Sequence, residues 1–218
     1  MILYDYILSP SCYKVRLLAS LLGVQLELRA VDFHPGREHK ADDLLNLNPA
    51  GSIPILVDDD FVLTESAAML AYLASKYGPD WAADGDPQAI ALQHQWLAFS
   101  NRLTATLGGA RLVEMLNFEG DLEALQSSGV VALRELEAAL FARRVSGGTF
   151  LVGDAPSIAD IACFPYVALA PDGSVSLDPY PSIRLWMRAL RALPGFIEMP
   201  GIHRLHELAQ DPLAEPDS

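Results

Sequence analysis

The stretch MILYDYILSPSCYKVRLLASLLGVQLELRAV, residues 1–31, decides the fold of the first part of the chain. Residues 2–8 form a β-rich run that ends at a Ser-Pro pair, and residues 13–22 then place leucine and valine at helical spacing. Residues 26–31 alternate apolar and polar side chains, a pattern typical of a strand. The opening therefore predicts a βαβ unit.

The chain after this unit predicts a short helix, a hairpin and another helix. An amphipathic segment at 44–47 favours a helix, which an Asn-Pro-Ala-Gly break ends. Apolar runs at 53–57 and 61–63 stand on either side of three aspartates, which predicts a β-hairpin. A helix then opens at Thr64 or Glu65 and ends before a Gly-Pro pair. The predicted order is βαβαββα.

The second part of the chain is rich in alanine and leucine and largely loses the strand patterns. A linker of glycine, proline and aspartate at 79–87 separates it from the first part, and long helical segments follow at 90–107 and 122–145. We therefore predict an α/β domain at 1–79 and an all-α domain at 86–218.

Two further helices and a frayed end complete this second part. Ser157 and Asp160 stand at the spacing of a capping box, which predicts a helix start there. Another helix is predicted through 183–193, and the end at 211–218, which contains proline, aspartate and glutamate, is expected to fray.

The composition of the 218 residues disfavours several classes of protein. Lysine and arginine number 15 against 28 aspartate and glutamate, and a net charge of −13 repels phosphate backbones, so general nucleic-acid binding is not expected. No run approaches the roughly 18 consecutive apolar residues of a membrane span. The start lacks a basic region and contains Asp5, unlike a signal peptide. We expect a cytoplasmic protein that does not bind membranes.

The two cysteines, Cys12 and Cys163, lie far apart in the sequence. They give neither a metal-ligand cluster nor a disulfide framework, so we expect reduced thiols and no metal. Cys12 ends the motif Ser9-Pro10-Ser11-Cys12 at a strand-to-helix junction, where a thioredoxin-type redox protein carries C-x-x-C. Because the first position is a serine, dithiol exchange by this motif is disfavoured.

Ser9 and Ser11 are the candidate catalytic residues. A strand-to-helix junction favours negative charge, because free N–H groups and the helix dipole face it. A serine there can donate a hydrogen bond to a ligand thiolate, whereas a free thiol of pKa about 8.5 is only roughly 3% ionised at pH 7. Ordinary N-capping explains the same serines, and the local pattern leaves both interpretations open.

Two later features fit the backbone and the ends of a peptide ligand. In the Gly-Ser-Ile-Pro run at 51–54, a cis X-Pro bond would leave backbone groups free to pair with an extended peptide, and a plain strand-start proline is the alternative. At 64–66, Ser66 could bind a carboxylate and Glu65 an ammonium group. Helix capping by the same residues explains them equally well.

Together these features resemble the cytosolic glutathione S-transferase family, in particular its serine-type bacterial, theta, zeta and delta-like members. The resemblance covers nearly the whole chain and lies in Ser9 to Arg16, Asn48-Pro49-Ala50-Gly51-Ser52-Ile53-Pro54-Ile55-Leu56, Leu63-Thr64-Glu65-Ser66-Ala67-Ala68 and Ser157-Ile158-Ala159-Asp160. It implies a thioredoxin-like N-terminal domain followed by a transferase-type helical bundle. It also implies a homodimer.

The resemblance assigns roles to individual residues. Ser9 matches the serine that activates the glutathione thiol, and Ser11 is the alternative because Pro10 follows Ser9 directly. The residues implied to bind glutathione are Cys12, His39, Ser52, Ile53, Pro54, Glu65 and Ser66. Ile53 would pair with the cysteinyl part, His39 would lie near the glycyl end, and Glu65 with Ser66 would hold the γ-glutamyl end. Cys12 is also expected to behave as a small buried hydrophobe.

An electrophile pocket is expected between the two domains, lined by Leu8, Arg111 and Met115, with Phe118 and Tyr166 as further candidates. A stripe at helical spacing is also typical of a core, so these residues have a second interpretation. The predicted activity is attack of the bound glutathione thiolate on a hydrophobic electrophile, with glutathione as co-substrate. Isomerase, etherase and disulfide reductase activities through the same thiolate, and a non-catalytic interaction module, stay open.

Overall fold

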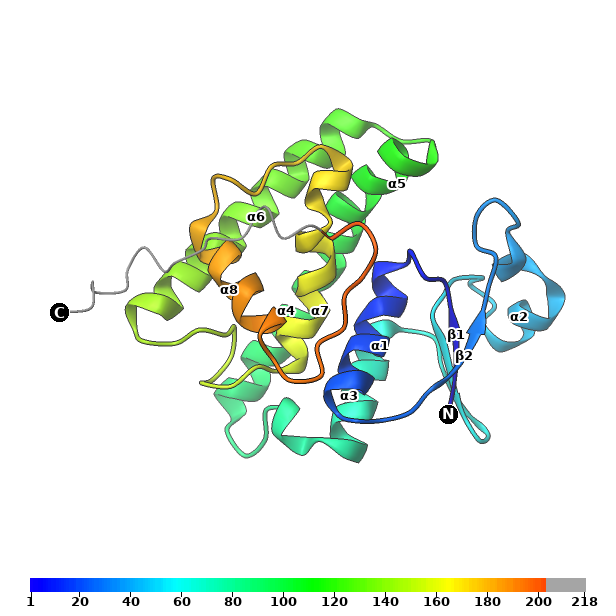
Figure 1. Ribbon diagram of the computed structural model, residues 1–218, viewed down its shortest axis with the longest axis horizontal. Helices are drawn as coiled ribbons and strands as arrows, with labels where there is room; N and C mark the ends of the chain where they lie inside the picture. The colour runs from blue at the N-terminus through cyan, green and yellow to red at the C-terminus, as the bar shows by residue number, and fades with distance from the viewer. Residues whose placement is uncertain (203–218) are drawn as a thin grey trace.

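A computed structural model gives the fold, and residues 1–202 are described in it. The predicted order βαβαββα is confirmed in the first part, whose elements are β1 (Ile2–Asp5), α1 (Pro10–Leu21), β2 (Glu27–Ala30), α2 (Asp42–Leu47), β3 (Ile55–Asp58), β4 (Phe61–Leu63) and α3 (Ser66–Tyr77). The sheet order is β2-β1-β3-β4, with β1 parallel to β2 and antiparallel to β3. This is the predicted thioredoxin-like architecture. In Figure 1, α1 and α3 lie between the sheet and the helical part.

Several elements of this part begin at other residues than predicted, most clearly the first helix and the third strand. The first helix begins at Pro10 rather than near residue 13, because proline fits the first helical position and the Ser9 hydroxyl accepts a hydrogen bond from the Cys12 amide. The third strand begins at Ile55, after Pro54, since proline cannot donate to the ladder. The Ile53–Pro54 peptide bond is cis.

The second part is helical, as predicted. Its elements are α4 (Pro87–Leu103), a π-helical turn (Thr104–Gly108), α5 (Gly109–Leu116), α6 (Leu122–Val145), α7 (Ile158–Ala168), a 3-10 turn (Ala170–Gly173) and α8 (Pro181–Arg191). The segment predicted at 90–107 therefore begins earlier and passes through the π-helical turn into a further helix. The end predicted to fray, 211–218, lies outside the described residues.

The core runs through α7, every residue of which is buried. The predicted capping box is present at its start: the Ser157 hydroxyl accepts from a first-turn amide, and Asp160 accepts from the Ser157 amide. Helix α7 packs against α1 and α3 of the first part and α4 of the second. Residues on α7 therefore reach the junction between the two parts.

Within residues 1–202, no helix is both long and apolar enough to cross a membrane. The same residues contain no cluster of three or more His, Cys, Asp or Glu side chains that could hold a metal ion.

Candidate functional site

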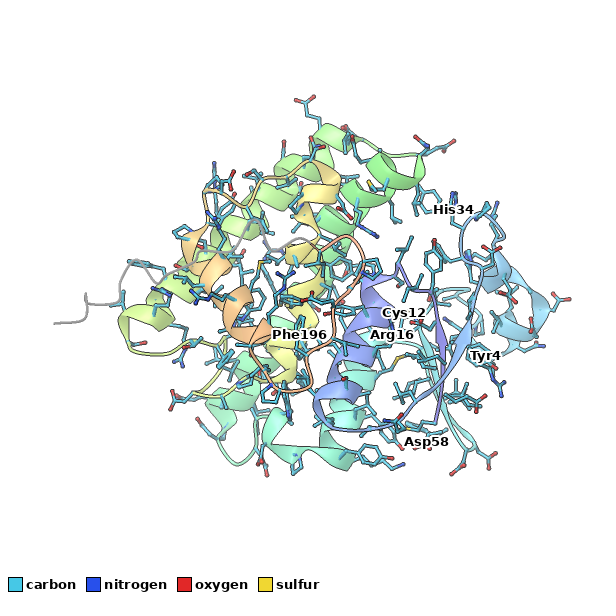
Figure 2. All side chains as sticks on the ribbon, in the orientation of Figure 1. Tyr4, Cys12, Arg16, His34, Asp58 and Phe196 are labelled. Atoms are coloured by element: carbon cyan, nitrogen blue, oxygen red, sulfur yellow. The ribbon has the colours of Figure 1, made fainter. Side chains whose placement is uncertain are left out.

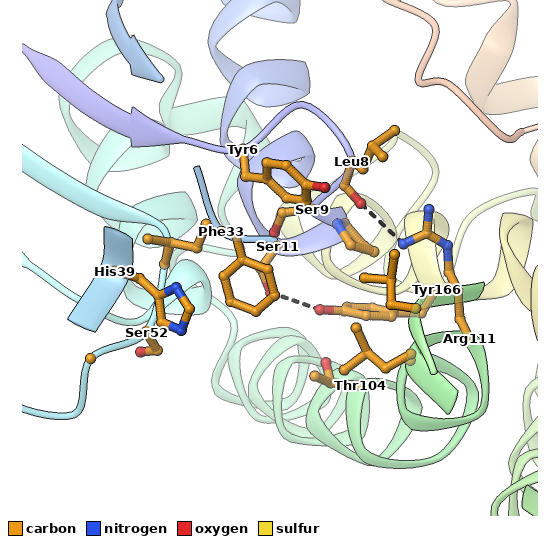
Figure 3. A pocket seen from close by; sticks show the side chains of 16 residues that line it. Tyr6, Leu8, Ser9, Ser11, Phe33, His39, Ser52, Thr104, Arg111 and Tyr166 are labelled. Carbon is orange, nitrogen blue, oxygen red and sulfur yellow. Dashed lines mark hydrogen bonds between the residues drawn. The ribbon is translucent and has the colours of Figure 1, made fainter. Parts of the chain in front are cut away.

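A cavity of about 350 Å³ opens where the β1–α1 junction of the first part faces α5 and α7 of the second. Figure 3 shows its walls. Its polar side chains come mainly from the β1–α1 junction, the segments around residues 39 and 52, and α7, and its apolar ones from both parts. The lining residues are Tyr6, Leu8, Ser9, Pro10, Ser11, Phe33, His39, Gly51, Ser52, Ile53, Thr104, Gly108, Arg111, Leu112, Leu116 and Tyr166.

Ser9 lies at this cavity as the N-cap of α1. Its hydroxyl oxygen accepts from the Cys12 amide over 3.3 Å, and this leaves the hydroxyl proton for a second partner. The Cys12 thiol is within hydrogen-bond reach of that hydroxyl, but a thiol sulfur is a weak acceptor. Ser9 can therefore turn its O–H to an anion in the cavity, and its capping role does not conflict with this.

Ser11, two residues further along the same junction, has a different partner. Its hydroxyl lies 2.7 Å from the Tyr166 hydroxyl on α7, a hydrogen bond drawn in Figure 3. Tyr166 is almost entirely buried, and burial raises the pKa of its phenol, while hydrogen bonding to Ser11 and Thr104 opposes that rise. The Ser11 hydroxyl is thus hydrogen-bonded to the helical part, whereas the Ser9 hydroxyl has no such bond in the part of the chain that the structure describes.

The structure does not support the expected contact between Cys12 and glutathione. The Cys12 side chain on α1, labelled in Figure 2, is fully buried and is absent from the cavity wall. Burial raises the pKa of its thiol to about 12. Cys12 is therefore a core residue, in agreement with its other interpretation as a small hydrophobe.

The segment that carries Ser52 and Ile53 is held by Asn48. The Asn48 amide donates to the Ser52 carbonyl oxygen over 2.8 Å and to the Ser52 hydroxyl over 3.0 Å. Gly51 has a φ of +56°, a left-handed conformation that favours glycine. Ser52 and Ile53 line the cavity. Pro54 is buried behind them and does not line it, so the structure does not support a direct contact between Pro54 and a ligand in the cavity.

His39 lies on the same side of the cavity. Its ring stacks on Phe33 with the ring centroids 4.3 Å apart, and burial and then the neighbouring Lys40 and Arg37 lower its pKa. The His39 Nδ1 atom is buried and has no hydrogen-bond partner among residues 1–202. A buried polar atom without a partner favours a ligand group at this position.

Glu65 and Ser66 stand at the N-terminus of α3 and do not line the cavity itself. Glu65 is exposed and makes no side-chain capping bond, so capping does not explain its carboxylate. Ser66 is half-buried, and its hydroxyl oxygen accepts from the Lys14 ammonium over 3.3 Å. Lys14 also lies over the ring of Tyr166, so this pair stands next to the cavity wall without being part of it.

The electrophile side of the cavity differs in part from the prediction. Leu8, Arg111 and Tyr166 line it, but Met115 is 54% exposed and faces away, and Leu112 and Leu116 occupy the wall instead. Phe118 is also outside the wall.

Arg111 lines the cavity, and its guanidinium group already has two hydrogen-bond partners. Its Nε donates to Asp172 over 2.9 Å and its Nη1 to the Leu8 carbonyl oxygen over 3.0 Å. Arg111 therefore holds the wall together rather than presenting a free cation.

Several cavity residues were missed from the sequence. Tyr6 and Phe33 follow β1 and β2 closely, so their place at the end of neighbouring strands could have indicated them. Thr104 and Gly108 come from the π-helical turn, for which the sequence carried no signal that we recognised.

Two family models match the chain: the glutathione S-transferase N-terminal domain over residues 1–75 and the glutathione S-transferase C-terminal domain over residues 118–194. Glutathione S-transferase theta-1 of Bos taurus is 31% identical over 220 residues, covering 96% of this chain and 90% of the relative. Maleylacetoacetate isomerase of Rattus norvegicus is 27% identical, covering 89% of each. The crystal structure of a glutathione S-transferase from Pseudomonas fluorescens is 30% identical with a TM-score of 0.82, covering 91% of this chain and 98% of that one.

Proposed function

Because the chain belongs to the glutathione S-transferase family, we propose that it conjugates glutathione to a hydrophobic electrophile and that Ser9 activates the thiol. The observation that carries this proposal is the Ser9 hydroxyl, which lines the cavity at a helix N-terminus with its proton available. A hydrogen bond from Ser9 stabilises the thiolate over the thiol. Lowering the thiol pKa by about two units, or about 2.7 kcal/mol, makes the thiolate the dominant form at pH 7.

Glutathione is proposed to lie along the Ile53 backbone, with its glycyl end near His39 and its γ-glutamyl end towards Glu65 and Ser66. The unpartnered His39 Nδ1 supports the first contact, and the helix N-terminus at Ser66 supports the second. The sulfur then forms a bond to an electrophilic carbon, the electron pair of the broken bond moves to the leaving group or into the electrophile, and the thiol proton goes to water. Leu8, Leu112, Leu116 and Phe33 supply an apolar wall for the electrophile.

An ultraviolet titration of bound glutathione in the wild type, Ser9→Ala and Ser11→Ala tests this proposal. We expect a thiol pKa near or below 7 that returns towards 8.5 in Ser9→Ala and not in Ser11→Ala, with turnover in Ser9→Ala lower by about 10- to 1000-fold. A reversal in Ser11→Ala would move the role to Ser11. Binding with an unshifted thiol pKa in the wild type would instead favour a non-catalytic module.

A glutathione-dependent isomerase is the second candidate, because the rat maleylacetoacetate isomerase resembles the chain over most of its length. It uses the same thiolate but regenerates it. Glutathione-dependent cis–trans isomerisation of a maleyl ketone without loss of glutathione would favour this candidate. Etherase and disulfide reductase activities would spend the thiolate and show as consumption of glutathione by an ether or a mixed disulfide.

We further propose a cytoplasmic homodimer. Light scattering of the purified chain tests the oligomeric state, and a mass of 23.7 kDa would contradict the dimer.

A further inference from the structure

Lys14 is a buried cation that the proposed reaction does not use. Its side chain is 1% exposed, on α1 between the two parts of the chain. Within residues 1–202 its ammonium makes no ion pair: its direct partners are the Ser66 hydroxyl at 3.3 Å and the face of the Tyr166 ring, 4.9 Å from the ring centroid. The Cys163 thiol and the Glu65 carboxylate act on it from further away and favour its charged form, but burial outweighs them. Burying an ammonium group that makes no ion pair costs stability. A sequence that retains it therefore gains something other than stability.

The Tyr166 ring connects this cation to the cavity. Tyr166 faces Lys14 with its ring, while its hydroxyl lines the cavity and bonds with Ser11. A cation over an aromatic face is attracted to the ring electrons, and it makes the attached hydroxyl a stronger donor. The effect is large here because both groups are shielded from water.

The Tyr166–Ser11 pair has one O–H to spare. Two hydroxyls carry two protons, and one of these joins the two oxygens. The Thr104 hydroxyl oxygen competes for the second of these protons. It can act only as an acceptor towards Tyr166, because the Thr104 hydroxyl proton is donated to the Ser100 carbonyl oxygen. An anionic oxygen is a stronger acceptor than a neutral hydroxyl, so an oxyanion in the cavity would take this second O–H.

The cavity wall around Tyr166 and Ser11 restricts which kind of ligand can carry the anionic oxygen. Leu8, Leu112 and Leu116 are apolar, and the Arg111 guanidinium is occupied by Asp172 and the Leu8 carbonyl. A carboxylic acid would therefore find no free arginine on this wall. A neutral apolar molecule with a single carbonyl group fits its chemistry best.

We propose that Lys14, Tyr166 and Ser11 form an oxyanion-stabilising group, and that the electrophiles of this protein are α,β-unsaturated carbonyl compounds. This inference rests on the proposed transferase function. The thiolate sulfur forms a bond to the β-carbon, the electrons of the carbon–carbon double bond shift to give an enolate, and the enolate oxygen accepts the spare O–H. Water then protonates the α-carbon. Lys14 acts through Tyr166 and is a positioning residue.

Two electrophiles distinguish this inference from the transferase function itself. The enone 4-phenyl-3-buten-2-one develops charge on oxygen, whereas benzyl bromide releases a large halide that accepts hydrogen bonds weakly. At saturating glutathione we expect Tyr166→Phe to lower kcat/KM for the enone by about 10- to 100-fold. The loss with benzyl bromide should be less than about threefold. Tyr77→Phe, at an exposed tyrosine, is the matched control.

The role of Lys14 is tested by combining substitutions. We expect Lys14→Met to lower the enone rate about tenfold in the wild type but by less than about twofold when Tyr166 is already phenylalanine, because the effect passes through the phenol. Lys76→Met, at an exposed lysine on α3, is the control.

Each outcome decides between the two claims. Equal losses with both electrophiles, or an unaltered enone rate, in Tyr166→Phe would overturn the oxyanion role while the transferase function stands. A Lys14→Met loss that persists in the Tyr166→Phe background would overturn the role of Lys14 and assign its effect to Ser66. A wild type inactive with both electrophiles would overturn the transferase function, and the inference with it.

Discussion

Arg111 and Leu8 are joined across the two parts of the chain, because the Arg111 Nη1 on α5 donates to the Leu8 carbonyl oxygen over 3.0 Å. Leu8 immediately precedes Ser9, so the helical part holds the turn that positions the candidate catalytic hydroxyl. Asp172 pairs with the same guanidinium, and both side chains are largely buried. The bond therefore couples the stability of the chain to the geometry of the site.

Replacing Arg111 should show both effects. We expect Arg111→Met to lower the free energy of unfolding by about 3 kcal/mol, because it leaves the Asp172 carboxylate buried without its partner, and urea denaturation measures this. Arg102→Met removes an exposed ion pair with Glu135 and should cost less than about 1 kcal/mol. Equal losses in the two variants would contradict the structural role of Arg111.

The sequence predicted Arg111 at the cavity but not what it does there. Its partners, Leu8 and Asp172, are distant in sequence, and no local pattern predicts such a contact. Met115 lies one turn beyond Arg111 on the same helix α5, yet its side chain is 54% exposed and is not part of the cavity wall. Helical spacing alone therefore does not predict which of these side chains reaches the cavity.

The two cysteines should be unreactive while the chain is folded. Both are fully buried, and burial raises the pKa of the Cys12 thiol to about 12 and that of Cys163 higher still. Only the thiolate reacts, so an aromatic disulfide reagent at pH 8 should label neither quickly. Both should react at once in concentrated guanidinium. Rapid labelling of one thiol in the native protein would refute the burial of Cys12 or Cys163.

Local sequence signals predicted more of the fold than of the site. The strand patterns, the hairpin aspartates and the capping box each depend on neighbouring residues, and each gave the right element. The partner of Ser11 comes from a residue 155 positions away, so the difference between Ser9 and Ser11 became visible only when Tyr166 was placed. The same holds for Lys14, which a helical pattern cannot mark as buried beneath that tyrosine.

Asp160 should be essential for stability rather than for chemistry. It is fully buried and accepts bonds from the Leu151 amide, the Ser157 amide and the Trp186 indole. We expect Asp160→Ala to lower the free energy of unfolding by about 3 kcal/mol or more, because buried donors lose their acceptor. Ser157→Ala should cost about 1 kcal/mol, the ordinary value of an N-cap. Thermal unfolding measures both, and a smaller loss in Asp160→Ala than in Ser157→Ala would be inconsistent with this account.

Lys14→Met should make the protein more stable at neutral pH, although the same substitution is expected to slow the enone reaction. Methionine does not carry the cost of burying a charge, which for a lysine pKa lowered to about 8 corresponds to about 3 kcal/mol. Urea denaturation at pH 7 measures this gain, and the exposed Lys76→Met should show none. A loss of stability in Lys14→Met would mean that the ammonium is a structural bond and that its burial needs no functional explanation.

The gain in stability on replacing Lys14 by methionine should also depend on pH in a defined direction. Burial lowers the pKa of Lys14 to about 8 in the folded chain, against about 10.4 in the unfolded chain. Between these values the unfolded chain binds more protons, so the wild type becomes more stable as the pH rises from 8 to about 10.4. Lys14→Met lacks this titration. Its advantage should therefore be largest at pH 7 and shrink towards pH 10, and an advantage that grew with pH would contradict a buried, charged Lys14.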